Sequence, residues 1–147
     1  MGVSMGPQDD PITYRSAVMP WQCDQMGHMN ARHIYAAFDD ATAVLMDMIG
    51  ASFADVAGTG LGWADVRQEI DFLREVANGR SITVRTRLDR MGRSSLTFSH
   101  AMSDDADEVY ARISIVSVRF DMAARKSVPI DDALRAVLRN LGTKEAA

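Results

Sequence analysis

Apolar residues recur every three or four positions between Asn30 and Gly50, and this spacing predicts one long amphipathic helix. Asn30 is a good N-cap residue because its side-chain oxygen can accept a hydrogen bond from an amide of the first turn. Gly50 suits the left-handed position that ends a helix. The apolar face that must be buried consists of Ile34, Ala37, Phe38, Ala41, Val44, Leu45, Met48 and Ile49.

The rest of the chain alternates apolar and polar residues, which is typical of strands that bury one face. Met91-Gly92-Arg93 separates two such runs and predicts a hairpin. In the last run the apolar phase changes after Ile115, which a bulge or burial on both faces would explain. Strands are predicted over residues 14–19, 66–72, 81–89, 95–102 and 108–121, and a short helix over residues 131–141. The predicted fold class is α+β.

Size and composition limit the possible functions. A chain of 147 residues with 47% hydrophobic content fits one domain, predicted over residues 13–147, and residues 1–12 lack periodicity and are predicted to be a flexible N-terminal tail. A net charge of −4 disfavours nucleic-acid binding. One cysteine cannot form an internal disulfide, and no apolar run has transmembrane length or signal-peptide layout. We therefore expect a cytoplasmic protein without membrane or nucleic-acid partners.

The segment from Trp21 to Asn30 carries the strongest chemical signal. Asp24 lies in a glycine-containing loop that runs directly into the long predicted helix. The first amides of a helix lack intrahelical partners and carry a partial positive charge, so they can polarise a carbonyl group beside a carboxylate. This arrangement favours an acyl-transfer site.

Residues Val18 to Ala41, with Asp24, Gly27, His28 and Asn30 in the pattern Asp-x-x-Gly-His-x-Asn, resemble the loop-helix signature of hotdog-fold acyl-CoA thioesterases. The branch is the 4-hydroxybenzoyl-CoA thioesterase-like family, and the resemblance extends over roughly residues 13–140, including segments 70–75, 88–95 and 128–130. It implies the hotdog fold, a curved antiparallel β-sheet wrapped around a long central α-helix. It also implies sheets joined edge to edge between subunits, with acyl-CoA sites between them.

The same resemblance places the catalytic carboxylate on Asp24, as a nucleophile or as a general base on water. The thioester oxygen would be held by amides at the start of the helix, and Gly27, His28 and Met29 remain open as candidates. Many relatives carry a further acid two residues before the catalytic one, but Gln22 stands there in this chain. The predicted site comprises Asp24, Gly27, His28, Met29 and Asn30. No cofactor is expected, because coenzyme A is part of the substrate.

These residues also have structural interpretations. Asp24 could close an Asx turn, His28 could be a hydrogen-bonding loop residue, and Asn30 is first a helix cap. Cys23 lacks a neighbouring histidine that would activate it. His28 and His33 are five residues apart rather than four, so no metal site is expected. His100 shares the phase of Phe98 and Met102 and is predicted to be a core or interface histidine.

A second group lies at the predicted hairpin turn. Arg90, Arg93, Ser94 and Ser95 could hold the phosphates of coenzyme A, or they could form a solvated hairpin tip. Glu69 and Asp71 could supply an acid to a neighbouring subunit, although exposure to solvent is the simpler interpretation.

The predicted function is hydrolysis of a thioester of coenzyme A or of an acyl carrier protein. The alternatives are a non-catalytic acyl-CoA-binding hotdog protein and a hotdog dehydratase or hydratase. The apolar alternation of residues 81–102 is assigned to a sheet edge, which would leave backbone groups unpaired in a monomer and so predicts a homodimer or a tetramer built as a dimer of dimers.

Overall fold

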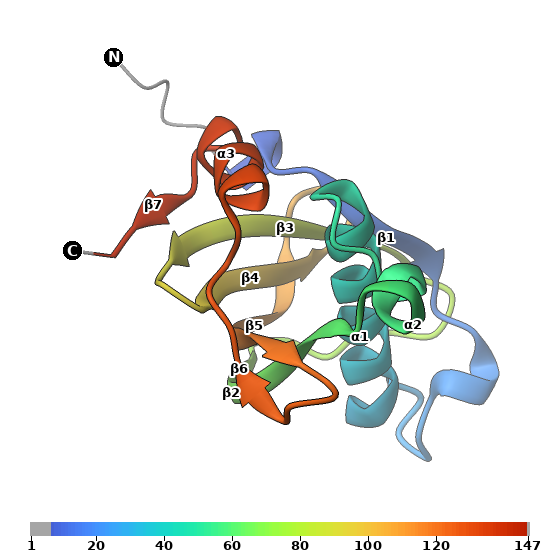
Figure 1. The fold of residues 1–147 in the computed structure, drawn as a ribbon. Helices are drawn as coiled ribbons and strands as arrows, with labels where there is room; N and C mark the ends of the chain where they lie inside the picture. The colour runs from blue at the N-terminus through green and yellow to red at the C-terminus, as the bar shows by residue number, and fades with distance from the viewer. Residues whose placement is uncertain (1–6, 147) are drawn as a thin grey trace. The chain divides into compact units, whose positions relative to one another are not determined.

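The computed structural model describes residues 7–146, and Figure 1 shows the elements coloured along the chain. The described residues form the helices α1, α2 and α3, three 3-10 helices and seven strands. The elements follow the order η1 (Pro7–Asp9), β1 (Ile12–Ala17), η2 (Pro20–Gln22), α1 (Ala31–Met48), η3 (Phe53–Asp55), α2 (Val56–Thr59), β2 (Leu61–Phe72), β3 (Ser81–Met91), β4 (Ser95–Ser103), β5 (Val109–Asp121), β6 (Lys126–Ser127), α3 (Asp132–Asn140) and β7 (Lys144–Glu145).

The strands form one sheet in the order β1-β3-β4-β5-β2. Strands β3, β4 and β5 are consecutive in the sequence, whereas the two edge strands β1 and β2 come from distant segments. The short strand β6 pairs with β5, and β7 pairs with β3 in parallel. The predicted hairpin of residues 81–89 and 95–102 is confirmed as β3 and β4, and the α+β class is confirmed.

The long predicted helix is confirmed as α1, which has 18 residues. Asn30 caps it, because its Oδ1 accepts a hydrogen bond from the amide of Arg32 at 3.1 Å. Gly50 follows its end with a φ of 81°, a conformation that glycine adopts without steric cost.

Two strand boundaries differ from the prediction. Strand β1 lies two residues earlier than predicted, because Pro20 already begins a 3-10 helix after the chain turns at Val18. Strand β2 begins at Leu61 instead of residue 66. Its extra residues follow Gly60, whose left-handed φ of 70° and carbonyl bond to the Met122 amide fix the start of the strand.

The apolar phase changes within β5, but the alternation of buried and exposed residues does not. From Ala111 to Arg119 every second residue is buried without interruption, and the buried positions after Ile115 are the polar residues Ser117 and Arg119. Val116, Val118 and Phe120 lie on the other face and are only partly exposed. Both faces are therefore partly covered, as one of the two predicted explanations requires.

The described part of the chain divides into two compact units. Unit 1 comprises residues 7–42, 70–87 and 100–113, and unit 2 comprises residues 43–69, 88–99 and 114–146. The prediction of a single domain over residues 13–147 stays a prediction. Of the predicted tail, residues 7–9 form a 3-10 helix, Asp10 pairs with Arg87 in β3 at 3.2 Å, and Ile12 already begins β1. Residues 1–6 lie outside the described residues.

His100 lies in the core of unit 1, 1% exposed, as predicted. Its two ring nitrogens contact the hydroxyls of Thr42 at 2.9 Å and Thr86 at 2.7 Å. Thr86 in turn contacts the Thr13 hydroxyl at 2.7 Å, which ties β1 to β3. Burial lowers the pKa of His100 to about 4, so the neutral ring fills this position at neutral pH.

Within residues 7–146 no single helix combines the length and the apolar composition needed to cross a membrane. One pair, residues 31–48 with residues 53–59, passes the same test together but is bent by 71°.

Candidate active site

Asp24 sits at the start of a tight loop in unit 1 that its own side chain closes. Its Oδ1 accepts hydrogen bonds from the amide of Met26 at 2.9 Å and, more weakly, from the amide of His28 at 3.4 Å. Its backbone amide donates to the carbonyl of His28 at 2.9 Å. Asp24 is partly exposed, and its second oxygen, Oδ2, has no hydrogen-bond partner among residues 7–146. The carboxylate thus shapes the loop with one oxygen and presents the other.

The loop is fixed at both ends. Cys23 and Met29 form an isolated antiparallel bridge, and His28 forms another with Ala77. Gly27 adopts a φ of 79°, the left-handed conformation that the turn needs. The predicted site residues from Asp24 to Asn30 are therefore brought together next to the first turn of α1.

The backbone amides predicted to hold the thioester oxygen are largely engaged. The amide of Gly27 donates to the Asp24 carbonyl at 3.1 Å, and the amide of Met29 donates to the Val76 carbonyl at 2.7 Å. His28 has only the long contact to Asp24 Oδ1. A further amide, that of Ala31 at the first position of α1, donates to no acceptor in the described part of the chain. Sequence reasoning missed Ala31, although its place directly after the Asn30 cap could have indicated it.

Glu75 is another neighbour that the sequence did not single out as a site residue. Its Oε2 lies 3.4 Å from Nδ1 of His28, whose side chain is 31% exposed. Nδ1 is buried and makes no hydrogen bond of good geometry to any described residue, so this is a close contact rather than a directed bond. The contact places a carboxylate from outside the loop next to the His28 ring.

The predicted phosphate-binding group lies in unit 2. Arg90 and Arg93 are exposed, Ser94 and Ser95 are half-buried, and neither arginine has an ion pair within residues 7–146. The turn between β3 and β4 is tight, because a Cβ added at Gly92 would lie 2.5 Å from Oγ of Ser95. The two arginines therefore flank a turn in which a side chain at position 92 would displace the hydroxyl of Ser95.

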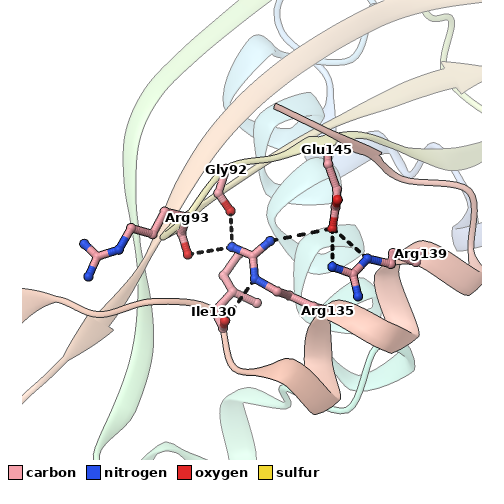
Figure 2. A network of polar contacts seen from close by, with 6 residues as sticks. All are labelled: Gly92, Arg93, Ile130, Arg135, Arg139 and Glu145. Carbon is pink, nitrogen blue, oxygen red and sulfur yellow. Dashed lines mark hydrogen bonds and ion pairs between the residues drawn. The ribbon is translucent and has the colours of Figure 1, made fainter. Parts of the chain in front are cut away.

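Arg135 of α3 holds this turn through its backbone (Figure 2). One guanidinium nitrogen donates to the carbonyls of Gly92 at 2.6 Å and Arg93 at 2.9 Å, and Nε donates to the carbonyl of Ile130 at 3.2 Å. Glu145 bridges Arg135 and Arg139 from the other side. The side chain of Arg93 points away from this network in Figure 2, so its charge stays available to a ligand.

The other candidate residues have local roles. The Cys23 thiol donates to the Met19 carbonyl at 3.6 Å, and the ring of His33 packs edge-on against Trp21 at 5.2 Å. Glu69 and Asp71 are exposed, and Glu69 pairs with Arg67 on the same strand. No group of three potential metal-ligating side chains occurs in the part of the chain that the structure describes.

Known proteins resemble the chain along most of its length. The model of the Thioesterase-like superfamily matches residues 18–138. An L-carnitine dehydrogenase/betainyl-CoA thioesterase from Agrobacterium fabrum is 30% identical over 122 residues, which are 83% of this chain and 25% of that protein. A betainyl-CoA thioesterase from Pseudomonas aeruginosa is 31% identical over 90 residues, which are 61% of this chain and 57% of that protein. The chain spans a quarter of the first relative and little more than half of the second.

The fold recurs in solved structures. A Staphylococcus aureus protein solved in complex with CoA aligns with a TM-score of 0.84 at 12% identity, over 94% of this chain and 88% of the other. The predicted hotdog fold is thereby confirmed.

Proposed function

Because the chain belongs to the Thioesterase-like superfamily, we propose that it hydrolyses the thioester bond of an acyl-CoA with Asp24 as the reacting carboxylate. The observation that carries the proposal is the carboxylate of Asp24, which presents an unpartnered oxygen beside the start of α1. The names of the two curated relatives support a coenzyme A thioester as the substrate class.

Two reaction courses fit this geometry. In the first, Oδ2 of Asp24 attacks the thioester carbon, the coenzyme A thiolate leaves, and water hydrolyses the resulting anhydride. In the second, Asp24 takes a proton from water, which attacks the same carbon directly. Both courses place negative charge on the thioester oxygen, so both need donors close to Asp24.

The amides of His28 and Ala31 are the best candidates for those donors. His28 has only a weak partner at 3.4 Å, and Ala31 has none among the described residues, whereas the amides of Gly27 and Met29 already donate to carbonyls. Ala31 also opens α1, where the helix dipole adds positive potential.

The predicted edge of residues 81–102 is wrong, because β3 and β4 lie inside the sheet, and the edge that supports assembly is strand β2. Its residues 65–69 are all exposed, and Val66 is 63% exposed although it lies within a strand. A long unpaired edge with an exposed apolar side chain favours pairing with a second copy. We therefore propose a homodimer, or a tetramer built from such dimers, which light scattering at micromolar concentration would detect; a stable monomer would contradict it.

The first experiment measures thiol release from a panel of acyl-CoAs and acyl carrier protein thioesters. Wild-type protein should turn over at least one of them, and Asp24→Asn should lose turnover while still binding a non-hydrolysable acyl-CoA analogue. Binding by the wild type without thiol release from any member would favour the non-catalytic alternative.

A second experiment concerns Arg90 and Arg93. The double variant Arg90→Ala/Arg93→Ala should raise KM for acyl-CoA about tenfold or more, because each charge-assisted hydrogen bond contributes about 1.5–3 kcal/mol. Turnover of a short acyl thioester without the nucleotide should stay unchanged. The exposed pair Arg125 and Lys126 supplies a matched control that removes the same charge. Equal losses on both substrates would place the arginines outside nucleotide binding.

A further inference from the structure

Beyond acyl-CoA hydrolysis, we propose that a cavity in unit 2 lined by Arg119 binds a small carboxylate. The cavity has a volume of about 260 Å³. Besides Arg119 it is lined mostly by small residues, namely Gly50, Ala51, Ser52, Ala54, Asp55, Gly58, Thr59 and Leu61. Because ligand pockets for drug-sized molecules begin at about 300 Å³, the occupant must be small.

Arg119 is a buried charge without a hydrogen-bond acceptor or an ion-pair partner among the described residues. It is 8% exposed, and its guanidinium makes no hydrogen bond or ion pair with any residue from 7 to 146. The guanidinium carbon lies 5.1 Å from the centre of the Trp63 ring, and Nε is buried without an acceptor. Burial holds the pKa of Arg119 below its usual value. A buried guanidinium that lacks an acceptor costs stability, so its retention points to a ligand.

The carboxylate that acts electrostatically on Arg119 does not pair with it. Asp131 attracts the guanidinium electrostatically but lies beyond ion-pair distance. Its Oδ1 is engaged in capping α3, where it accepts from the amide of Leu134 at 2.8 Å. The backbone fixes Arg119 on the buried face, because its amide donates to Ser94 and its carbonyl accepts from Val128.

Two more donors near Arg119 lack acceptors. Ser117 lies two residues before Arg119 on β5 and therefore shares its face, and its Oγ is buried without a partner. Nε1 of Trp63, under the guanidinium, is also buried and unpartnered. At the cavity wall, Oγ of Ser52 accepts from the Ala54 amide at 3.2 Å but donates to no described acceptor. Of these groups Ser52 lines the cavity together with Arg119, and a carboxylate there supplies two acceptor oxygens with a compensating charge.

A cationic occupant fits poorly. The face of Trp63 that a quaternary ammonium would need is already covered by Arg119, whose charge would repel it. Asp55 lines the cavity from an exposed position, and its carboxylate would favour a cation. Replacing Asp55 by asparagine should therefore strengthen the binding of a carboxylate and weaken the binding of a cation.

The binding experiment uses the fluorescence of Trp63. The chain has two tryptophans, and Trp21 is 71% exposed, so Trp21→Phe leaves Trp63 as the single reporter. Succinate should change its emission in a saturable way, whereas choline should not. In the same background Arg119→Met should raise Kd for succinate at least about tenfold, the loss expected for one charge-assisted contact. Asp55→Asn should lower Kd because it removes a repelling charge.

Arg125→Met is the matched control. Arg125 also lies over an aromatic ring, with its guanidinium carbon 5.2 Å from the centre of Phe120, but it is exposed and does not line the cavity. It should leave succinate binding unchanged. Succinyl-CoA compared with butanoyl-CoA distinguishes the source of the carboxylate, because Arg119→Met raises KM only for succinyl-CoA if the acyl group occupies the cavity. An effect confined to free succinate identifies a free acid as the ligand.

Thermal unfolding distinguishes a ligand-binding role of Arg119 from a role in stabilising the fold. Without ligand, Arg119→Met should raise Tm by about 2–4 °C, because an apolar side chain replaces an unpaired buried charge. A lower Tm in Arg119→Met, or the absence of saturable binding of both succinate and succinyl-CoA to the wild-type cavity, would overturn the proposal. Binding of choline that is weakened by Asp55→Asn would overturn it as well. Because succinate binding needs no thioester hydrolysis, this outcome is independent of the proposed function.

Discussion

The loops that begin at Asp24 and Asp104 in unit 1 have the same construction although their sequences differ. Oδ1 of Asp104 accepts from the amides two and four residues later, Ala106 and Glu108, both at 3.0 Å. Asp24 makes the same two contacts at 2.9 and 3.4 Å. In each loop the aspartate amide also donates to the carbonyl four residues on. The residue three positions after each aspartate has a left-handed backbone conformation, Gly27 with φ 79° and Asp107 with φ 61°.

The two aspartates differ in their second oxygen. Oδ2 of Asp104 accepts from the hydroxyl of Tyr110 at 2.9 Å, whereas Oδ2 of Asp24 has no partner among the described residues. The hydrogen bond from the Glu108 amide is the main cause that holds the pKa of Asp104 below its usual value. The two loops therefore share a backbone turn but differ at the second carboxylate oxygen. We expect the surroundings of that oxygen to decide whether the carboxylate reacts.

The sharpest way to break this comparison is to make the same substitution in both loops. An asparagine keeps the Oδ1 acceptor, so each loop should keep its shape. Asp24→Asn should lower kcat at least ~10²-fold, the lower range for losing a positioned base, and Asp104→Asn should leave kcat nearly unchanged. Steady-state thiol release gives both values. Equal losses would show that both aspartates act only through the fold of unit 1.

The next largest effect is the loss of stability that we expect in unit 1 at acidic pH. The pKa of His100 is depressed from 6.5 to about 4. The unfolded chain therefore binds more protons between these values, so stability is complete above pH 6.5 and falls as the pH drops toward 4. The full loss is about 3 kcal/mol, at about 1.4 kcal/mol for each pKa unit.

Urea unfolding between pH 7.5 and pH 5 measures the part of this loss that lies above the usual carboxylate range, about 2 kcal/mol. A flat profile would contradict the neutral buried ring. His33→Gln is the matched control, because it removes a half-buried histidine that lies outside this core cluster. The two loop variants should therefore be compared above pH 6.5.

A smaller effect is expected at the left-handed position of each loop. Gly27→Ala should cost about 1 kcal/mol of stability, because a Cβ disfavours this conformation. No atom lies within 4 Å of the added Cβ, so the cost is conformational. Asp107→Gly should not incur that cost. Urea unfolding of both variants tests the expectation, and a neutral Gly27→Ala would mean that the loop can adopt another turn.

The smallest effect is expected from Tyr110→Phe, which removes the partner of Asp104 Oδ2. The variant should lose about 1 kcal/mol of stability, the net value of a typical hydrogen bond. Thiol release should not change, because freeing an oxygen in this loop does not place it beside a helix start. A change in kcat without a change in stability would show that the two loops are not independent.

The sequence predicted elements whose pattern is local. Helix α1 followed from its apolar period and from Asn30 and Gly50, and both caps are present. The start of β2 was missed because Leu61-Gly62-Trp63-Ala64 does not alternate. These residues are in a strand because they pair with β5 in the sheet, and not because of their own apolar pattern.

The candidate site was predictable only in part. The loop from Asp24 to Asn30 could be recognised from its residue types and spacing. The contact of Glu75 with His28 joins segments that are distant in sequence, and the likeness of the two loops depends on φ angles and hydrogen bonds. The burial of Arg119 could not be predicted, because a charged residue near the end of a strand is normally exposed to solvent. Roles that arise from tertiary contacts cannot be derived from local patterns.

The strand order β1-β3-β4-β5-β2 also has a consequence for the time course of folding. Strands β3, β4 and β5 are joined by short turns, so their pairing closes only short loops of chain. Strand β1 must find β3 across the whole of α1 and β2, with Tyr14 opposite Val84. Contacts that are close in sequence form fastest. We expect the central three strands to be protected from hydrogen exchange first during refolding, and β1 to be added to them late.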